Sequence, residues 1–218
     1  MIVHWERYPT FFVMFLVNTF PSISMVLKKT ASLISIIFHP MVVSTCLFIL
    51  IIYTEPPISK SSHLEFFVSF FFTSAIVSFT VFLLLKHNKI ADFNASIRKE
   101  RVVPLALGTV YFFIGFIILY LIGAKPLVQG TMLCYLINSA IGFLITNKWK
   151  ISMHAFGLGI PFVILLVNDF KYLFILVVII FLVCVSRVVL KIHSISQVIT
   201  GLGLSMLNTY LIMKVFFL

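Results

Sequence analysis

Long, nearly continuous apolar runs alternate with short polar segments over most of this chain. A membrane-spanning helix needs roughly 20 apolar residues, and continuous rather than alternating apolar runs favour helices over a membrane β-barrel. The pattern therefore predicts an all-α, polytopic membrane bundle of six to seven transmembrane helices. The fifth and sixth runs are short, which is typical of tilted or re-entrant segments. The expected spans are residues 31–53, 64–85, 104–123, 128–146, 152–167, 171–186 and 195–214.

The first 30 residues differ from the rest of the chain. Their apolar stretch, "FFVMFLVNTF", is short for a span, and no small-residue cleavage site follows it as in a secretory signal peptide. We expect residues 1–30 to form an N-terminal lead-in, either an interfacial helix or a short extra one. Residues 31–218 are expected to form a single membrane-embedded domain.

Composition supports this class and excludes others. The chain is 61% hydrophobic and only 10% charged, whereas soluble domains carry about 25% charged residues. The net charge of +10 does not indicate nucleic-acid binding, because the cations lie in short loops between apolar runs. Cys46, Cys134 and Cys184 fall inside apolar runs, so neither a disulfide nor a zinc site is expected. We predict a multi-pass protein of the cell membrane.

Positive charge is concentrated on one side of the predicted bundle. His154 and His193 lie on the same side, each at the entrance of a span. His39 precedes Pro40 inside the first expected span, where a kink with the imidazole bonded to a neighbouring helix is the simplest interpretation. The loops after the second, fourth and sixth spans carry Lys86, Lys89, Arg98, Lys99, Arg101, Lys148, Lys150, Arg187 and Lys191.

Three segments on that side have spacings of interest. In "SIRKERVVPL", Arg98 and Arg101 are three residues apart and share a helix face. In "KWKISMH", Ser152 is placed to cap the fifth span. In "SRVVLKIHSISQ", His193 and Gln197 are four residues apart and are neighbours on one helix face.

Together these segments form a convergent set of cations, imidazoles and one hydroxyl, with few carboxylates. Arginine forks bind phosphate oxygens, one imidazole can attack phosphorus, and another can protonate the departing alkoxide. The set therefore favours a phosphate ester or pyrophosphate as ligand. Its members are Arg98, Lys99, Arg101, Lys150, Ser152, His154, Arg187 and His193.

These motifs resemble those of the type-2 phosphatidic acid phosphatase family of membrane lipid phosphatases, most of all its small bacterial members. "SRVVLKIH" resembles the third motif of that family, "ISMH" keeps the serine and histidine of the second, and "RKERVVP" is a loose version of the first. The second motif's proline and glycine are replaced by Ile151 and Met153. The acidic residue expected after the nucleophile is replaced by Gln197.

The resemblance implies a metal-independent hydrolase without cofactors. His193 would be the nucleophile that forms a phosphohistidine, and His154 the general acid. Gln197 would orient the nucleophile without supplying a charge. The implied substrates are phosphatidic acid, phosphatidylglycerol phosphate or a polyprenyl pyrophosphate, with surrounding membrane lipids as the other partners. The phosphate would be held by Arg187, Ser152, and Arg101 or Lys99, with Arg98 and Lys150 as neighbouring cations.

Alternatives remain open at this stage. Gln197 favours a non-catalytic membrane protein of the same fold, which would bind lipid or act as a subunit of a complex. A membrane prenyltransferase is disfavoured, because such enzymes need paired aspartate-rich motifs for magnesium and this chain has six acidic residues in all. No pair of interrupted spans indicates a transporter. The sequence leaves open the lipid, the membrane side and the oligomeric state.

Overall fold

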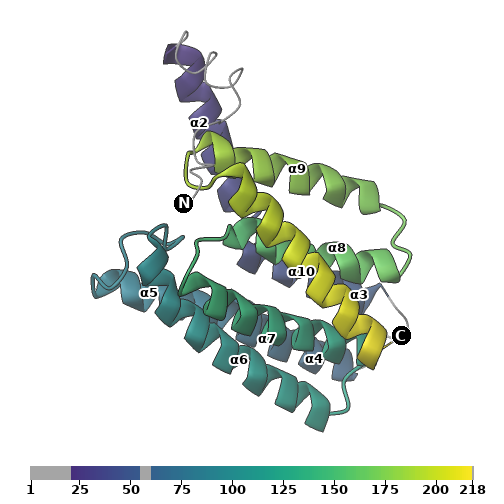
Figure 1. Ribbon diagram of the computed structural model, residues 1–218. Helices are drawn as coiled ribbons and strands as arrows, with labels where there is room; N and C mark the ends of the chain where they lie inside the picture. The colour runs from purple at the N-terminus through teal and green to yellow at the C-terminus, as the bar shows by residue number, and fades with distance from the viewer. Residues whose placement is uncertain (1–20, 55–59, 218) are drawn as a thin grey trace, which may run out of the picture.

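The computed structural model describes residues 21–54 and 60–217, and within those ranges every regular element is a helix (Figure 1). The helices run mostly alongside one another, with α10 crossing the bundle diagonally and α2 projecting beyond one end. The elements are α2 (Pro21–Ile37), α3 (Pro40–Tyr53), α4 (Lys60–Phe70), the π-helix η1 (Phe71–Ala75), α5 (Ile76–Lys86), the 3₁₀-helix η2 (Arg98–Arg101), α6 (Val102–Leu121), α7 (Pro126–Thr146), α8 (Met153–Val167), α9 (Leu173–Val189) and α10 (Ile195–Phe216).

The lengths and composition of these helices are those of a membrane protein. Fewer of them are long enough to span a membrane than the sequence predicted. In the described part of the chain, four helical segments are long and apolar enough to cross a membrane, or five if the bent pair α2–α3 counts as one span. Helices α8 and α9, at 15 and 17 residues, are apolar but shorter. The expectation of short fifth and sixth runs is thus confirmed. The four segments are Ser61–Lys86, Arg98–Leu121, Pro126–Thr146 and Ile195–Phe216.

The expected first span, 31–53, is broken at His39 and Pro40. Proline lacks an N–H and suits the first position of a helix, so α3 begins at Pro40 and the chain bends there by 45°. His39 caps α3, since its Nδ1 accepts the N–H of Met41 at 3.4 Å. The predicted kink is confirmed, but the predicted bond to a neighbouring helix is wrong: the ring bonds the start of its own helix.

The N-terminal boundary expected at residue 30 falls inside α2, which runs without interruption from Pro21 to Ile37. The predicted lead-in helix over the earlier stretch, residues 1–20, lies outside the described residues. Helix α2 packs against α9, and so belongs with the bundle.

The loops that follow α5, α7 and α9 gather at one end of the bundle (Figure 1). The connections α6–α7 and α8–α9 and the C-terminus lie at the opposite end. Small residues press α10 against α8: a Cβ atom on Gly159 would lie 2.7 Å from the Ser205 side chain, and one on Gly201 would lie 3.2 Å from the Ser152 carbonyl oxygen. This close packing fixes the start of α8 beside the start of α10.

Candidate functional site

Arg101 joins the three loops at the cation-rich end. Its Nε donates to the carbonyl of Ala95 at 2.6 Å, and one terminal nitrogen donates to the carbonyl of Ile151 at 2.8 Å. Its other terminal nitrogen lies 3.5 Å from Nε2 of His193. The side chain is buried although it is charged. The structure thus brings the segments after α5, α7 and α9 together around one guanidinium.

His193 and Gln197 form the pair that the sequence predicted. Gln197 completes a capping box with Ser194 at the start of α10, and its Oε1 accepts the backbone N–H of Ser194 at 3.3 Å. The same oxygen lies 3.0 Å from Nδ1 of His193. Because that oxygen is an acceptor, Nδ1 must carry the hydrogen, and the lone pair of Nε2 faces the Arg101 guanidinium.

The electrostatic surroundings keep this imidazole uncharged. Burial, followed by the charge of Arg101, lowers the pKa of His193 to about 3, and the bond from Gln197 offsets only part of this. Burial and the charges of Arg101 and Arg187 also lower the pKa of Lys150 from its usual value. At neutral pH His193 is therefore a neutral imidazole whose Nε2 lone pair lies beside a guanidinium.

Arg187 is the most deeply buried cation of the site. Its side chain is 1% exposed, and its Nε has no hydrogen-bond partner in the described part of the chain. Its positive charge is close enough to act on Lys150 and His193. A buried polar N–H without an acceptor is costly, so this position favours an anionic ligand that can accept from it.

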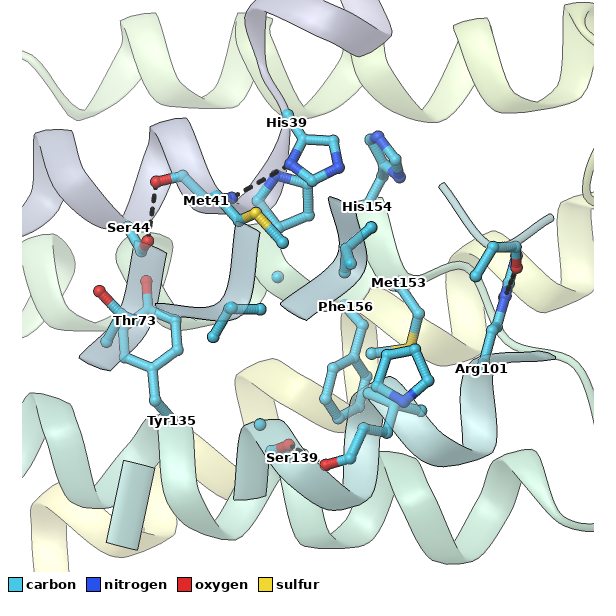
Figure 2. A pocket seen from close by; sticks show the side chains of 18 of the residues that line it. His39, Met41, Ser44, Thr73, Arg101, Tyr135, Ser139, Met153, His154 and Phe156 are labelled. Carbon is cyan, nitrogen blue, oxygen red and sulfur yellow. Dashed lines mark hydrogen bonds between the residues drawn. The ribbon is translucent and has the colours of Figure 1, made fainter. Parts of the chain in front are cut away.

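His154 lies on the first turn of α8, beside His39 (Figure 2). Its Nε2 is 3.2 Å from the carbonyl oxygen of Ser35 on α2, so this nitrogen carries the hydrogen and Nδ1 is unprotonated. The rings of His39 and His154 meet edge to face with centroids 5.1 Å apart. His39, His154 and Arg101 together line one cavity, of about 180 Å³, that continues between the helices.

Arg101, Arg187, His154 and His193 are called the polar cluster below. The other predicted site residues mostly hold the loops around this cluster in place. Ser152 caps α8 as expected, with its Oγ accepting the N–H of Ala155. Lys150 donates to the carbonyl of Ile192 at 2.9 Å and so ties two of the loops together. Arg98 donates to two carbonyls at the end of α7 and is turned away from His193.

Lys99 is exposed, and the structure does not bring it to the cluster. Of the two candidates for the first-motif cation, the geometry therefore selects Arg101. Asp92 is the carboxylate whose charge acts on Arg101, Lys150 and Arg187. Its oxygens already accept the N–H groups of Asn94 and Ser96. Three cations thus face one carboxylate, and the excess positive charge suits a phosphate group.

Sequence reasoning missed two features of this site. His39 was interpreted only as a kink residue, yet it lines the cavity beside His154. Its position before a proline predicted the bend, but no local signal predicted that the bend would bring it to α8. No role in this site was expected of Asp92, although its charge acts on three of the cations. Among the described residues, no group of three or more His, Cys, Asp or Glu side chains is placed to hold a metal ion.

Comparisons of the chain with protein-family models, with characterised proteins and with solved structures find no match. The resemblance to the lipid phosphatases therefore rests on the motif residues alone.

We expect inorganic phosphate to stabilise the parent protein and to leave the Arg187→Met variant unchanged. A ligand at 100 times its dissociation constant stabilises the folded state by about 2.7 kcal/mol. In phosphate-free buffer Arg187→Met is expected to be at least as stable as the parent, because a buried cation with an unsatisfied N–H is replaced by an apolar side chain. The measurement is thermal unfolding in detergent with and without phosphate.

The matched control for this experiment is Arg98→Met. Arg98 binds backbone carbonyls rather than facing the cluster, so this variant should lose some stability and retain the full response to phosphate. Equal phosphate responses in the parent and in Arg187→Met would show that Arg187 does not hold the anion.

Proposed function

We propose that the protein is a multi-pass phosphatase of the cell membrane, with six to seven spans, that hydrolyses a phosphomonoester or pyrophosphate of a lipid. Phosphatidic acid, phosphatidylglycerol phosphate and polyprenyl pyrophosphates belong to this class. The observation that carries the proposal is the neutral His193 imidazole, whose Nε2 lone pair lies beside the Arg101 guanidinium while Gln197 holds Nδ1. Nucleophilic catalysis requires such an uncharged, oriented nitrogen next to a group that holds the electrophile.

In the proposed reaction, Nε2 of His193 attacks phosphorus and the bond from phosphorus to the lipid oxygen breaks. His154, whose Nδ1 is unprotonated at rest, takes up a proton there when the substrate binds, and it then gives that proton to the departing oxygen. Water then attacks phosphorus and gives a proton to His154, and the bond from phosphorus to Nε2 breaks, which releases inorganic phosphate and restores the imidazole. Arg101 and Arg187 hold the non-bridging oxygens, where negative charge is spread in the transition state.

A second candidate is a non-catalytic lipid-binding protein. It is favoured by the amide at Gln197, which accepts a hydrogen bond but cannot stabilise a charged imidazole, and by the ordinary structural bond from His154 to the Ser35 carbonyl. Both candidates use the same cations to bind a phosphate group, so binding alone does not separate them.

Phosphate release distinguishes the two. The purified protein is incubated with a panel of lipid phosphates and pyrophosphates in the presence of a chelator. Turnover with the chelator present is expected for the phosphatase, since the proposed chemistry uses only side chains. Binding of the lipids without release of phosphate from any of them would favour the non-catalytic candidate.

A further inference from the structure

A narrow cavity leads from the polar cluster into the middle of the bundle. Arg101, His39 and His154 lie at its polar end (Figure 2). Its lining extends from Arg101, at the end of η2, through Gly108 to Phe112 on α6. At a rise of 1.5 Å per residue these positions span roughly 16 Å.

The walls of this cavity are apolar in effect. Most of the hydroxyl and amide groups along it are bonded to the bundle itself; the exception is the buried Tyr135 hydroxyl, which has no hydrogen-bond partner among the described residues. Thr73 donates to the carbonyl of Ser69, Ser139 bonds Thr109, and Asn138 donates to the carbonyl of Cys134. Beyond the polar end of the cavity, these groups leave few hydrogen-bonding atoms for a ligand. The interior therefore suits a hydrocarbon chain.

The helices that border the cavity are shaped to leave it open. The π-helix η1 interrupts the helix formed by α4 and α5 at the level of Thr73, and such insertions are frequent at functional sites. Gly108 faces the space from α6: a Cβ atom there would meet nothing closer than 3.8 Å. A larger side chain at that position would enter the cavity.

We propose that this cavity binds the hydrocarbon chain of a lipid phosphate whose head group lies at Arg101 and His154, and that the preferred substrates carry one chain. The proposal rests on the proposed function for the reaction but not for binding. A volume of about 180 Å³ is close to that of an engineered cavity of about 150 Å³ that holds a single benzene ring. It therefore has room for one narrow chain and not for two.

The depth of the cavity sets the chain length. An extended chain advances roughly 1.2 Å per covalent bond, so the lined length of roughly 16 Å corresponds to on the order of a dozen bonds, whereas the volume holds on the order of eight carbons by comparison with benzene in about 150 Å³. Longer chains would have to continue through an opening into the surrounding lipid. Linear alkyl phosphates of 4 to 16 carbons are thus suitable probes.

The test compares butyl phosphate and dodecyl phosphate as substrates of the parent and of Gly108→Leu. One misplaced methylene-sized group in an apolar site costs about tenfold or more in kcat/KM. We expect Gly108→Leu to lower kcat/KM for dodecyl phosphate by at least about tenfold and to leave butyl phosphate within about twofold. Gly108→Ala, which the surrounding space tolerates, should show a smaller effect in the same direction.

Gly203→Leu is the matched control. Gly203 lies on α10, is exposed, and has nothing within 4 Å of the position of an added Cβ atom. This variant makes the same change of residue away from the cavity, so both substrates should stay within about twofold of the parent. An equal loss on both substrates in Gly108→Leu, or a loss on neither in both Gly108 variants, would overturn the assignment. Faster turnover of a two-chain phosphatidic acid than of dodecyl phosphate would overturn the single-chain preference.

Binding of uncleavable alkylphosphonates separates this inference from the proposed function. Dodecylphosphonate should raise the thermal unfolding midpoint of the parent more than butylphosphonate does, and Gly108→Leu should remove that difference. If this pattern holds while no phosphate ester is hydrolysed, the cavity assignment stands and the phosphatase does not. If esters are hydrolysed with no dependence on chain length, the phosphatase stands and the cavity assignment fails.

Discussion

His193→Ala is expected to reduce phosphate release from any lipid phosphate by about 10⁴-fold or more, the scale of loss when a nucleophile of this kind is removed. The variant should remain folded, because the His193 ring bonds only Arg101 and Gln197 among the described residues. The measurement is phosphate release by purified protein, with folded protein quantified by its thermal transition. His87→Ala is the matched control, since His87 is exposed at the end of α5.

The two histidines should respond differently to the leaving group. A general acid contributes about 10² to 10⁴-fold, and only where the departing oxygen needs a proton. His154→Ala should therefore regain most of its rate on a nitrophenyl phosphate ester, whereas His193→Ala should stay inactive on both kinds of substrate. Parent-like turnover in His193→Ala would end its assignment as nucleophile.

Local periodicity predicted the helices but not how many of them cross a membrane. The apolar runs marked α6, α7 and α10 to within a few residues, because a lipid-facing helix must be apolar along its length. Runs 152–167 and 171–186 were counted as spans although α8 and α9 fall short of full length. The break at His39 was anticipated as a kink, but the rule for Pro40 gives no bend angle, since the angle depends on packing against distant helices.

The topology of the chain predicted that the three loops of the site lie at the same end of the bundle. It did not predict which side chains meet there. Loops separated each time by two spans must return to the same side, and the structure confirms that Arg101, Ile151 and His193 meet there. Whether Lys99 or Arg101 faced the cluster was beyond a single sequence, because adjacent residues of a short helical turn point in different directions. The cavity depends on space between four or more helices, and no spacing within one segment encodes that.

Helix caps account for much of what the sequence did predict about the site. Ser152 was expected to cap α8 and does; for α10 the sequence offers Ser194 or Ser196, and the structure has Ser194 as the cap. A cap fixes the first turn of a helix, and with it the neighbour four residues away. This is why the contact between His193 and Gln197 could be predicted from spacing alone.

The substitution Gln197→Glu is expected to raise the rate of phosphate release at neutral pH. Glutamate has the same reach as glutamine, so it can accept both hydrogen bonds that Gln197 Oε1 now accepts, from His193 Nδ1 and from the Ser194 N–H. Its carboxylate would also stabilise the positive imidazole that forms when Nε2 is phosphorylated. Gln197→Asp should give a smaller increase, because it is one methylene shorter, and Gln197→Leu should lower the rate.

The dependence of kcat/KM on pH tests the cause of these changes. The nucleophile is active when neutral, so the parent loses activity as the pH falls through the pKa of His193, which is about 3. A carboxylate at position 197 raises that pKa, and the acid limb of the profile should therefore move to higher pH in Gln197→Glu. Gln197→Leu should not move the limb upward, because it adds no negative charge.

Ser194→Ala separates this effect from helix capping. Ser194 Oγ accepts the backbone N–H of Gln197, so its removal should cost about 1 kcal/mol of stability while leaving the contact between His193 and Gln197 in place. We expect its acid limb to coincide with that of the parent at matched amounts of folded protein. If Gln197→Glu and Gln197→Leu both leave the rate and the limb unchanged, then Gln197 serves only as a helix cap. The charge of residue 197 would then play no part in the reaction of His193.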